Sequence, residues 1–326
     1  MDASVNCPNC RTTNPLGAAV CRACGAALMA PSTAVTAPDL PPLPSTNMAT
    51  TLVESRSAAV FEAGRAAWLL SSGYYTDLGR ERKSNEDSLL VVEMDRVNLS
   101  AANPLGLYVV ADGMGGQAAG EVASGLVVST IARAAHDDLF AKYLGGVLAE
   151  TYIGSWMKSA IAVANNAVVS RRAADHNNMG STLVMAVVFG SAAYLAHAGD
   201  SRAYYLPSDG ELERVTGDHS LVEQLVRSGQ ITAAEARTHP KRSVIYRTMG
   251  EKEDVEADTH MLELAPGDRL VLCSDGLNGM IEDDQIAAII RAAASPAQAA
   301  RRLVAAANAG GGRDNITAIV VDTSSL

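Results

Sequence analysis

The sequence predicts an α+β fold with packed sheets, and three observations indicate it. Short apolar runs of strand length recur along the chain, longer stretches show helical periodicity, and the two do not alternate as regular βαβ units would. Hydrophobic residues make up 48% of the 326 residues and aromatic residues only 4%, so the core must consist of aliphatic side chains. Strands are expected at residues 88–93, 107–111, 182–189, 192–197, 202–206, 269–273 and 316–321.

The helices are predicted from apolar residues at helical spacing and from the residues that end them. Val122, Leu126 and Ile131 recur near such a spacing. Near the C-terminus, Ser295-Pro296 divides one periodic region into two helices, and a run of three glycines ends the second. Helices are therefore expected over residues 58–70, 120–135, 155–171 and 221–228, and as a pair within 283–307.

Four of the five cysteines lie within the first 24 residues. They form two C-x-x-C pairs, Cys7 with Cys10 and Cys21 with Cys24, a spacing typical of a zinc ribbon in which four thiolates bind one tetrahedral Zn²⁺. So short a segment cannot bury enough apolar surface to fold alone, so metal binding would supply its folding free energy. An iron site of the rubredoxin type is the nearest alternative, and two disulfides are less favoured without a secretory signal.

The composition changes after the cysteine-rich segment. Residues 30–57 are rich in Pro, Ser and Thr and hold almost no large apolar residue, which predicts an extended linker. Phosphorylation of its threonines is an alternative role for this stretch. We therefore expect a zinc-ribbon-like segment over residues 1–28, a linker with a possible short helix over 29–72, and one large domain over 73–326.

The overall charge and the lack of a long apolar run exclude several classes of protein. The net charge is −10 at pH 7, and the ribbon has only Arg11 and Arg22 as basic residues, which argues against a nucleic-acid surface. No stretch reaches the ~18 to 20 apolar residues of a membrane span, and the start lacks the features of a signal peptide. We expect a cytoplasmic monomer that binds neither nucleic acid nor a membrane.

Acidic residues stand at the ends of three predicted strands. Asp112 follows the run at 107–111, Asp275 follows the run that ends at Cys273, and Asp314 precedes the run that starts at Ile316. Several carboxylates cannot converge without cations, because like charges repel strongly in a low dielectric. Oxygen ligands without a matching set of His or Cys select Mg²⁺ or Mn²⁺. The pattern predicts a carboxylate site for two divalent metals.

Five short segments, taken in order, resemble the metal-dependent serine/threonine protein phosphatases (the PPM, or protein phosphatase 2C-like, family) in their bacterial form. The resemblance covers the chain from about Tyr74 to Val321. It implies a central antiparallel β-sandwich flanked by helices on both faces (α-β-β-α), with the metals at one end. The segments are Arg82-Lys83-Ser84-Asn85-Glu86-Asp87, Ala111-Asp112-Gly113-Met114-Gly115-Gly116, Gly199-Asp200-Ser201-Arg202, Ser274-Asp275-Gly276 and Gly312-Arg313-Asp314-Asn315.

The resemblance also implies a role for the acidic residues of these segments. Asp112 would bridge two Mn²⁺ or Mg²⁺ ions, with the carbonyl of Gly113 as a further ligand. Asp275 and Asp314 would hold one of the two metals. Glu86 would act on the second metal, and Asp87 nearby would orient the ligands. The metal pair would activate a water for in-line attack on phosphorus.

Four further residues are singled out by the resemblance or by their chemistry. Arg82 would grip the phosphate in a bidentate manner, with Arg80 as the alternative. Asp200 would bind a weaker third metal, unless it only caps a turn. Met114 stands where eukaryotic relatives carry a His proposed as general acid, so the leaving group must be protonated otherwise. A metal-bound water is the first candidate for this proton, and His219 the second.

We therefore expect an enzyme that hydrolyses phosphoserine and phosphothreonine on proteins, opposing a bacterial Ser/Thr kinase and acting on that kinase and its substrates. The stretch 218–250 resembles the flap beside the family's active site and is expected to contact substrate. One alternative is a catalytically weak sensor or scaffold that acts through its zinc ribbon, although Asp112, Asp275 and Asp314 are all present. Another is a hydrolase of small phosphates or nucleotides.

Overall fold

The computed structural model describes residues 4–7, 10–15, 18, 21–24, 68–95, 97–98, 101–116 and 119–325. The chain divides into two compact units, Met1–Arg56 and Ser57–Leu326, each of which is described by itself. The linker expected within residues 30–57 and most of the helix expected over 58–70 lie outside the described residues.

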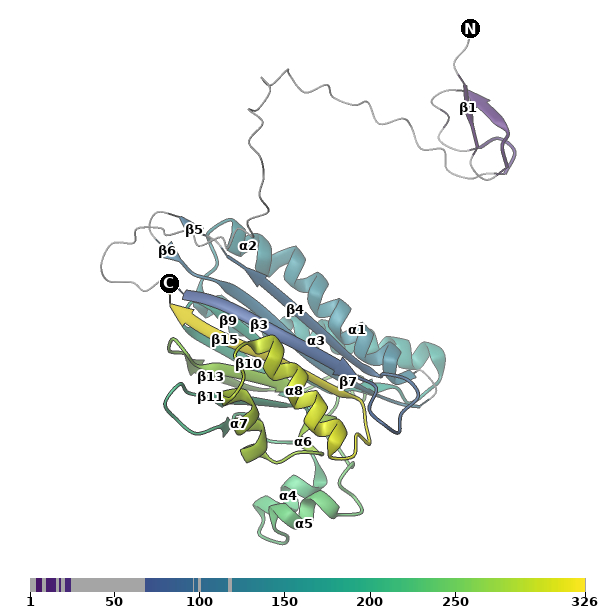
Figure 1. The fold of residues 1–326 in the computed structure, drawn as a ribbon. Coiled ribbons are helices and arrows are strands. Elements are labelled where there is room, and N and C mark those ends of the chain that lie inside the picture. Colours follow the sequence, from purple (N-terminus) through teal and green to yellow (C-terminus); the bar gives the residue numbers. More distant parts are fainter. Residues whose placement is uncertain are drawn as a thin grey trace, which may run out of the picture. The chain divides into compact units, whose positions relative to one another are not determined.

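Two antiparallel sheets form the centre of the second unit (Figure 1). The first contains β4 (Asp87–Met94), β7 (Leu105–Met114), β8 (Gly180–Ser181), β9 (Leu183–Phe189), β10 (Ala192–Ala198) and β13 (Asp258–Glu263). The second contains β3 (Trp68–Asp77), β11 (Arg202–Leu206), β12 (Glu213–Arg214), β14 (Arg269–Cys273) and β15 (Ile316–Ser325). Their strand orders are β13-β10-β9-β7-β4, with β8 paired to β7, and β12-β11-β14-β15-β3. A separate ladder joins β5 (Val97–Asn98) to β6 (Ala101–Ala102).

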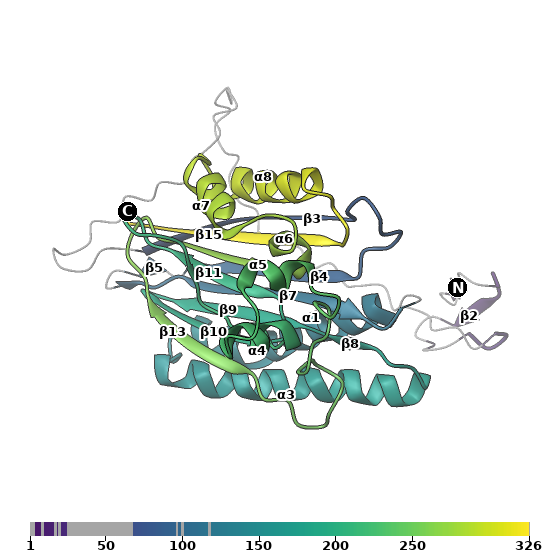
Figure 2. The same ribbon diagram turned by 90° about the horizontal axis from the view of Figure 1, so that it is seen from below.

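Helices cover the outer face of each sheet, as Figure 2 shows. On the first sheet lie α1 (Ala119–Ala134) and α3 (Glu150–Asp175), joined through a π-helical turn, η1 (Ala135–Phe140), and α2 (Ala141–Leu144). On the second lie α7 (Asp283–Arg291) and α8 (Pro296–Ala309), preceded by α6 (Asp275–Asn278). Two short helices, α4 (Leu221–Arg227) and α5 (Ala233–Thr238), extend away from the sheets (Figure 1). This helix–sheet–sheet–helix order confirms the predicted α-β-β-α sandwich.

The alternation of side chains along β7 explains why two layers of core form. Tyr108 and Val110 pack between the two sheets, in a cluster that includes Leu270 from β14. Leu107 and Val109 point to the other face and pack under the helices. Because successive residues of a strand face opposite sides, a strand covered on both faces must be apolar throughout. The continuous apolar run of β7 is therefore a consequence of its central position.

The expected strands are present with small differences at their ends, and the structure corrects one prediction. Residues Trp68–Leu70, expected at the end of a helix, belong to β3, which pairs with β15 along its whole length. Leu70 packs against the cluster between the sheets. Periodicity alone cannot separate helix from strand in a short apolar run, and here the ladder with β15 decides. Among the described residues, no helix is long and apolar enough to span a membrane.

Candidate metal centre

Two carboxylates lie side by side where β4 and β7 meet. Asp87 is the first residue of β4, and its register partner on β7 is Asp112. Ser274, which directly follows β14 in the second sheet, donates from its Oγ to Asp87 Oδ2 (2.7 Å). The Thr317 amide in turn donates to Ser274 Oγ (3.0 Å). The ends of both sheets are therefore joined at the point where these carboxylates lie.

Three further carboxylates come from the connections between strands. Asp275 starts α6, two residues after the end of β14. Asp314 precedes β15 by two residues, and Asp200 lies in the tight connection between β10 and β11. All three act on Asp112, because the charges of Asp275, Asp200 and Asp314, together with that of Asp87, raise the pKa of Asp112. The structure thus brings together the aspartates that the sequence indicated separately.

Burial and mutual repulsion raise the pKa values of the clustered aspartates, so a cation among them would stabilise their charged forms. Burial, opposed by the hydrogen bond from Ser274 and reinforced by neighbouring carboxylates, raises the pKa of Asp87 to about 7. Burial and the Asp314 carboxylate raise the pKa of Asp275 to about 6. Burial first, and then the neighbouring carboxylates, raise the pKa of Asp112 and of Asp200 well above the ordinary range.

Unpartnered oxygens complete the evidence for a cation site. Among the described residues, Oδ1 of Asp87, Asp200 and Asp275 is buried without a hydrogen-bond partner. A buried acceptor that is left without a donor is costly, and several together in an acidic cluster are better explained by an ion. The donor set is made of oxygens, so it fits hard divalent cations such as Mg²⁺ and Mn²⁺.

Arg82 lies at the edge of this cluster. Its Nη2 contacts Asp314 Oδ2 at 2.6 Å, and its guanidinium also interacts electrostatically with Glu86 and Asp112. The side chain is 48% exposed, so it borders both solvent and the carboxylates. Arg80, the alternative in the sequence, is exposed, and its backbone amide donates to the Gly312 carbonyl. Of the two arginines, Arg82 is therefore the better placed to contact a ligand at the carboxylate cluster.

Asn315 was not singled out as functional from the sequence, yet it fixes the loop that carries Arg82 and Glu86. Its Oδ1 accepts the Glu86 amide (2.8 Å), and its Nδ2 donates to the carbonyls of Leu78 (3.0 Å) and Ser84 (2.9 Å). The residue is only 4% exposed. The signal in the sequence was its position directly after Asp314. A polar side chain at that position can hold the loop of Asp314 against the loop of Glu86.

Gly113 permits a close approach of helix α1 to the site. Its amide donates to the Glu86 carbonyl (3.1 Å), which connects it to the start of β4. A Cβ at this position would lie 2.0 Å from the carbonyl oxygen of Gly120 in α1. Only glycine therefore fits, which explains the Asp-Gly pair in the sequence. The Glu86 carboxylate also packs against α1, because a Cβ on Gly120 would lie 2.5 Å from Glu86 Oε2.

His219, the second candidate for a proton donor, does not lie free in the site. Its side chain is 4% exposed, and Nδ1 accepts the Gly199 amide (3.1 Å). Burial, the neighbouring His197 and Arg247 lower its pKa to about 4. A neutral imidazole with its lone pair already occupied is a poor general acid near neutral pH. These contacts do not favour His219 as the proton donor.

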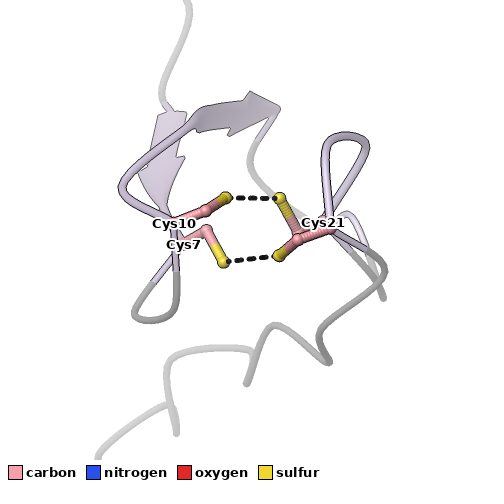
Figure 3. A group of neighbouring side chains, drawn as sticks. Cys7, Cys10 and Cys21 are labelled. Atoms are coloured by element: carbon pink, nitrogen blue, oxygen red, sulfur yellow. Dashed lines mark hydrogen bonds between the residues drawn. The ribbon is translucent and has the colours of Figure 1, made fainter.

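The first unit contains the cysteine cluster. Strands β1 (Ser4–Asn6) and β2 (Thr13–Pro15) pair antiparallel beside it. Figure 3 shows Cys7, Cys10 and Cys21 pointing toward one centre, and the ligand atoms of all four cysteines lie within 4.8 Å of one another. The Sγ atoms of Cys7 and Cys24, and those of Cys10 and Cys21, are 3.6 Å apart.

These sulfur distances distinguish between the two kinds of site that the sequence left open, a metal bound by thiolates and a pair of disulfides. A disulfide bond has a length of about 2.05 Å, so neither pair is bonded. Zinc–sulfur bonds of about 2.3 Å in a tetrahedron put sulfurs about 3.8 Å apart. The Ala23 amide donates to Cys21 Sγ (3.4 Å) and, as the main cause, lowers the pKa of this thiol to about 6. The cluster thus favours a thiolate-bound metal over disulfides.

Comparison with known proteins agrees with the fold and the carboxylate cluster. Residues 80–308 match the Protein phosphatase 2C family. The serine/threonine phosphatase stp of Listeria innocua is 35% identical over 255 residues, which are 78% of this chain and 96% of that protein. The serine/threonine protein phosphatase PstP of Mycobacterium tuberculosis is 38% identical over 260 residues, which are 79% of this chain and 46% of that protein.

Solved structures give the same result. The catalytic domain of the phosphatase PstP, in complex with two manganese ions, matches with a TM-score of 0.66 and 33% identity, covering 79% of this chain and 100% of that one. The S. agalactiae serine/threonine phosphatase matches with a TM-score of 0.67 and 31% identity, covering 78% and 99%.

Fold and site together define a metal-dependent protein phosphatase. With the match over residues 80–308 and relatives at this level of identity, the chain belongs to the protein phosphatase 2C family. The resemblance predicted from five short segments is confirmed, as is the class of enzyme. The roles of individual residues and the metal at the cysteines are not decided by these comparisons and are treated as proposals below.

Proposed function

We propose that this protein removes phosphate from phosphoserine and phosphothreonine on proteins, using divalent cations held by the carboxylate centre. The observation that carries the proposal is the group of buried, unpartnered oxygens on Asp87, Asp200 and Asp275 around Asp112. Nothing in a stable apolar core requires such a cluster, whereas a cation site does. Mn²⁺ is the cation to test first, because a structure of PstP holds two manganese ions.

Each acidic residue has a distinct task in this proposal. Asp112, half-buried at the end of β7, would bridge the cations together with the carbonyl of Gly113. Asp275 and Asp314 would hold one of them, and Glu86 the other. When bound, two divalent cations would activate a water and offset the charge of the phosphoryl oxygens. All of these side chains sit on strand ends or on loops tied to them, which keeps the site rigid.

Asp87 and Asp200 have supporting roles. Asp87 Oδ2 accepts the hydroxyl of Ser274, so this carboxylate is oriented from the opposite sheet. It would fix the ligands beside it, in the manner of groups that surround a metal site without binding the metal directly. Asp200 is 7% exposed and has an unpartnered oxygen, which supports its use as a ligand of a weaker third cation.

Arg82 would bind the phosphate. Its guanidinium reaches Asp314 in the structure, and it carries several donors in one plane that match the oxygens of a phosphate monoester. An incoming phosphate would exchange one anion for another at this guanidinium, since the side chain is half exposed. Met114 has no proton to donate and His219 is occupied, so we assign the leaving-group proton to water held at the centre.

We infer that the cysteine cluster binds Zn²⁺ and serves as a separate domain for docking to other proteins. The sulfur spacing and the lowered pKa of Cys21 support this assignment. The physiological partners proposed are phosphorylated proteins, including a Ser/Thr kinase that the phosphatase opposes and the substrates of that kinase.

The experiment that tests the function compares three substrates in the presence of Mn²⁺. A phosphothreonine peptide, a nucleotide and a small aryl phosphate are supplied to the full chain at equal concentration. We expect metal-dependent, saturable release of phosphate that is fastest from the peptide. Preference for the nucleotide would indicate a small-molecule hydrolase, and no turnover at any Mn²⁺ concentration would indicate a sensor or scaffold.

A further inference from the structure

Two loops lie side by side at the end of the sandwich that holds the carboxylates (Figure 2). One joins β3 to β4 and carries Arg80 and Arg82, and the other joins α8 to β15 and carries Arg313. The Arg80 amide donates to the carbonyl of Gly312 (2.6 Å). Asn315 holds the same two loops together through its contacts with two carbonyls of the first loop. The backbone positions of all three arginines are therefore fixed relative to one another.

The side chains of Arg80 and Arg313 leave the two loops at neighbouring points. A Cβ on Gly312 would lie 2.8 Å from Arg80 Cγ, so the Arg80 side chain runs beside Gly312. Gly312 directly precedes Arg313 in the chain, and consecutive Cα atoms are about 3.8 Å apart. Both arginines are exposed. Two guanidinium groups on flexible stems can therefore reach one anion in front of this loop.

These two arginines have no counterion within the described part of the chain. Neither forms an ion pair with a described carboxylate, whereas Arg82 contacts Asp314 at 2.6 Å. Glu81 lies between Arg80 and Arg82 in the chain, but it is exposed and forms no ion pair with any residue that the structure describes. Exposed like charges that lie close together repel one another, although water and salt weaken the repulsion. An anion would bind to this pair through two charge-assisted contacts.

The position of the pair relative to Arg82 sets where such an anion would lie on a substrate. Arg80 and Arg82 are two residues apart, so their Cα atoms are at most about 7 Å apart. Alternate side chains of an extended peptide are also separated by about 7 Å. A peptide whose phosphothreonine lies at Arg82 would therefore place a second anionic group at Arg80 and Arg313 when that group is about two residues away.

A phosphate suits this pair of arginines better than a carboxylate does. Phosphate on a side chain has three acceptor oxygens and a charge of about −1.5 to −2 at pH 7, whereas a carboxylate has two oxygens and a single charge. The planar guanidinium binds phosphate oxygens in a bidentate manner, and a tetrahedral phosphate has oxygens for two such groups.

We propose that Arg80 and Arg313 form a second anion subsite, which selects phosphopeptides that carry a further phosphate or acidic residue two positions from the phosphothreonine. The subsite serves the activity described above, so this inference rests on the proposed function. Arg82 binds the phosphate that is removed, while Arg80 and Arg313 bind the anion that stays on the peptide. These two arginines thus determine specificity and take no part in the chemical step.

The test compares three phosphothreonine peptides, supplied to the full chain with Mn²⁺. Two positions from the phosphothreonine they carry a non-hydrolysable phosphonate, a Glu or an Ala, so that only the phosphothreonine can release phosphate. One set of peptides varies the position on the N-terminal side, and another set the position on the C-terminal side. The quantity measured is kcat/KM for phosphate release, expressed as a ratio to the Ala peptide.

Two double variants separate the subsite from overall charge. Arg80→Gln with Arg313→Gln removes both charges but keeps the Cγ atoms that lie beside the glycines of the loop. Arg133→Gln with Lys158→Gln, at exposed residues of α1 and α3, changes the net charge equally and is the matched control. Because each enzyme is compared with itself on the Ala peptide, a general loss of activity cancels in the ratio.

In at least one set of peptides, we expect ratios of about tenfold for the phosphonate and about threefold for Glu, in the wild type and in the control. Both ratios should fall below about twofold in Arg80→Gln with Arg313→Gln. A larger ratio for Glu than for the phosphonate would support the subsite and assign it to carboxylates. Ratios near one in the wild type for both sets would overturn the inference, as would equal ratios in the wild type and in Arg80→Gln with Arg313→Gln.

Binding of the same peptides, labelled with a fluorophore and followed by anisotropy in Mn²⁺, separates this inference from the proposed function. Tighter binding of the phosphonate peptide, lost in Arg80→Gln with Arg313→Gln and accompanied by no turnover of any peptide, would refute the phosphatase and support the subsite. Turnover of all peptides with equal kcat/KM would refute the subsite alone. The absence of both turnover and any difference in binding would refute both.

Discussion

Replacing Asp275 by Asn should make the metal-free protein more stable while it abolishes activity. Burial and the Asp314 carboxylate raise the pKa of Asp275 from 3.8 to about 6. One pKa unit is about 1.4 kcal/mol, so ionising this group costs the metal-free folded state about 3 kcal/mol relative to the unfolded state. An amide is close in shape to the neutral acid and removes that cost. Above about pH 6, Asp275→Asn should therefore gain up to about 3 kcal/mol.

The pH dependence of this gain has a definite sign. The folded pKa of Asp275 is raised, so the folded state binds the proton more tightly than the unfolded state does between pH 3.8 and about 6. The metal-free wild type consequently loses stability as the pH rises through this window. The advantage of Asp275→Asn should vanish near pH 4 and be complete above about pH 6.

Urea unfolding in excess chelator measures the effect on the catalytic unit alone. Both tryptophans, Trp68 and Trp156, belong to the second unit, so their fluorescence is used to follow the unfolding of this unit. Asp254→Asn, at an exposed aspartate, is the matched control and should leave stability unchanged. In saturating Mn²⁺ the order should reverse, because only the wild type gains binding free energy at this ligand.

Two results would refute the reasoning. A metal-free Asp275→Asn protein that is less stable than the wild type at about pH 7.5 would show that the carboxylate is satisfied by the protein itself. A gain of equal size at pH 4 and at about pH 7.5 would show that the effect does not come from ionisation.

Three further predictions follow from individual contacts. Arg82→Lys should raise the KM for a phosphothreonine peptide about tenfold, with little change in stability because the side chain is 48% exposed; steady-state kinetics measures this, and an unchanged KM would exclude Arg82 from phosphate binding. Asn315→Ala should cost about 2–4 kcal/mol in urea unfolding and lower kcat, since it leaves the Glu86 amide and two carbonyls without their partner; a stability loss without any loss of kcat would make Asn315 purely structural. Cys10→Ser should remove bound zinc in elemental analysis and leave hydrolysis of a small aryl phosphate unchanged; retained zinc would contradict the four-thiolate site.

Much of the fold follows from local patterns in the sequence. The run that became β7 could be predicted because burial on both faces makes a strand uniformly apolar, and the break between α7 and α8 because Ser295 caps the second helix and Pro296 starts it. By contrast, β13 was not expected. It is the edge strand of its sheet, its residues are largely exposed, and it carries no apolar run that would mark a strand.

One helix was missed although a signal existed, and one segment was assigned wrongly because local patterns carry no signal for it. Helix α5 has no buried residue, but Thr232 and Glu235 form a capping box that marks its start. Residues 68–70 were assigned to a helix because their pairing with β15 involves residues about 250 positions later, and such long-range contacts leave no trace in local periodicity.

The site shows the same division between local and long-range information. Residue types and short segments indicated Asp112, Asp275 and Asp314, because each stands at the end of an apolar run. The contacts that orient Asp87 and Glu86 could not be predicted, since Ser274 reaches Asp87 and Asn315 reaches the loop of Glu86 across more than 180 positions. His219 is an example. Its residue type suggested a proton donor, and only the structure shows that its Nδ1 accepts a hydrogen bond from the Gly199 amide.

The central claim, that the carboxylate centre is a cation-dependent phosphatase site, is tested most directly by phosphate release from a phosphothreonine peptide. The wild type and Asp275→Asn are titrated with Mn²⁺, each with an excess-chelator control. We predict saturable turnover of the wild type that chelator abolishes, and no turnover of Asp275→Asn at any Mn²⁺ concentration. Turnover in chelator, or full activity of Asp275→Asn, would contradict the account.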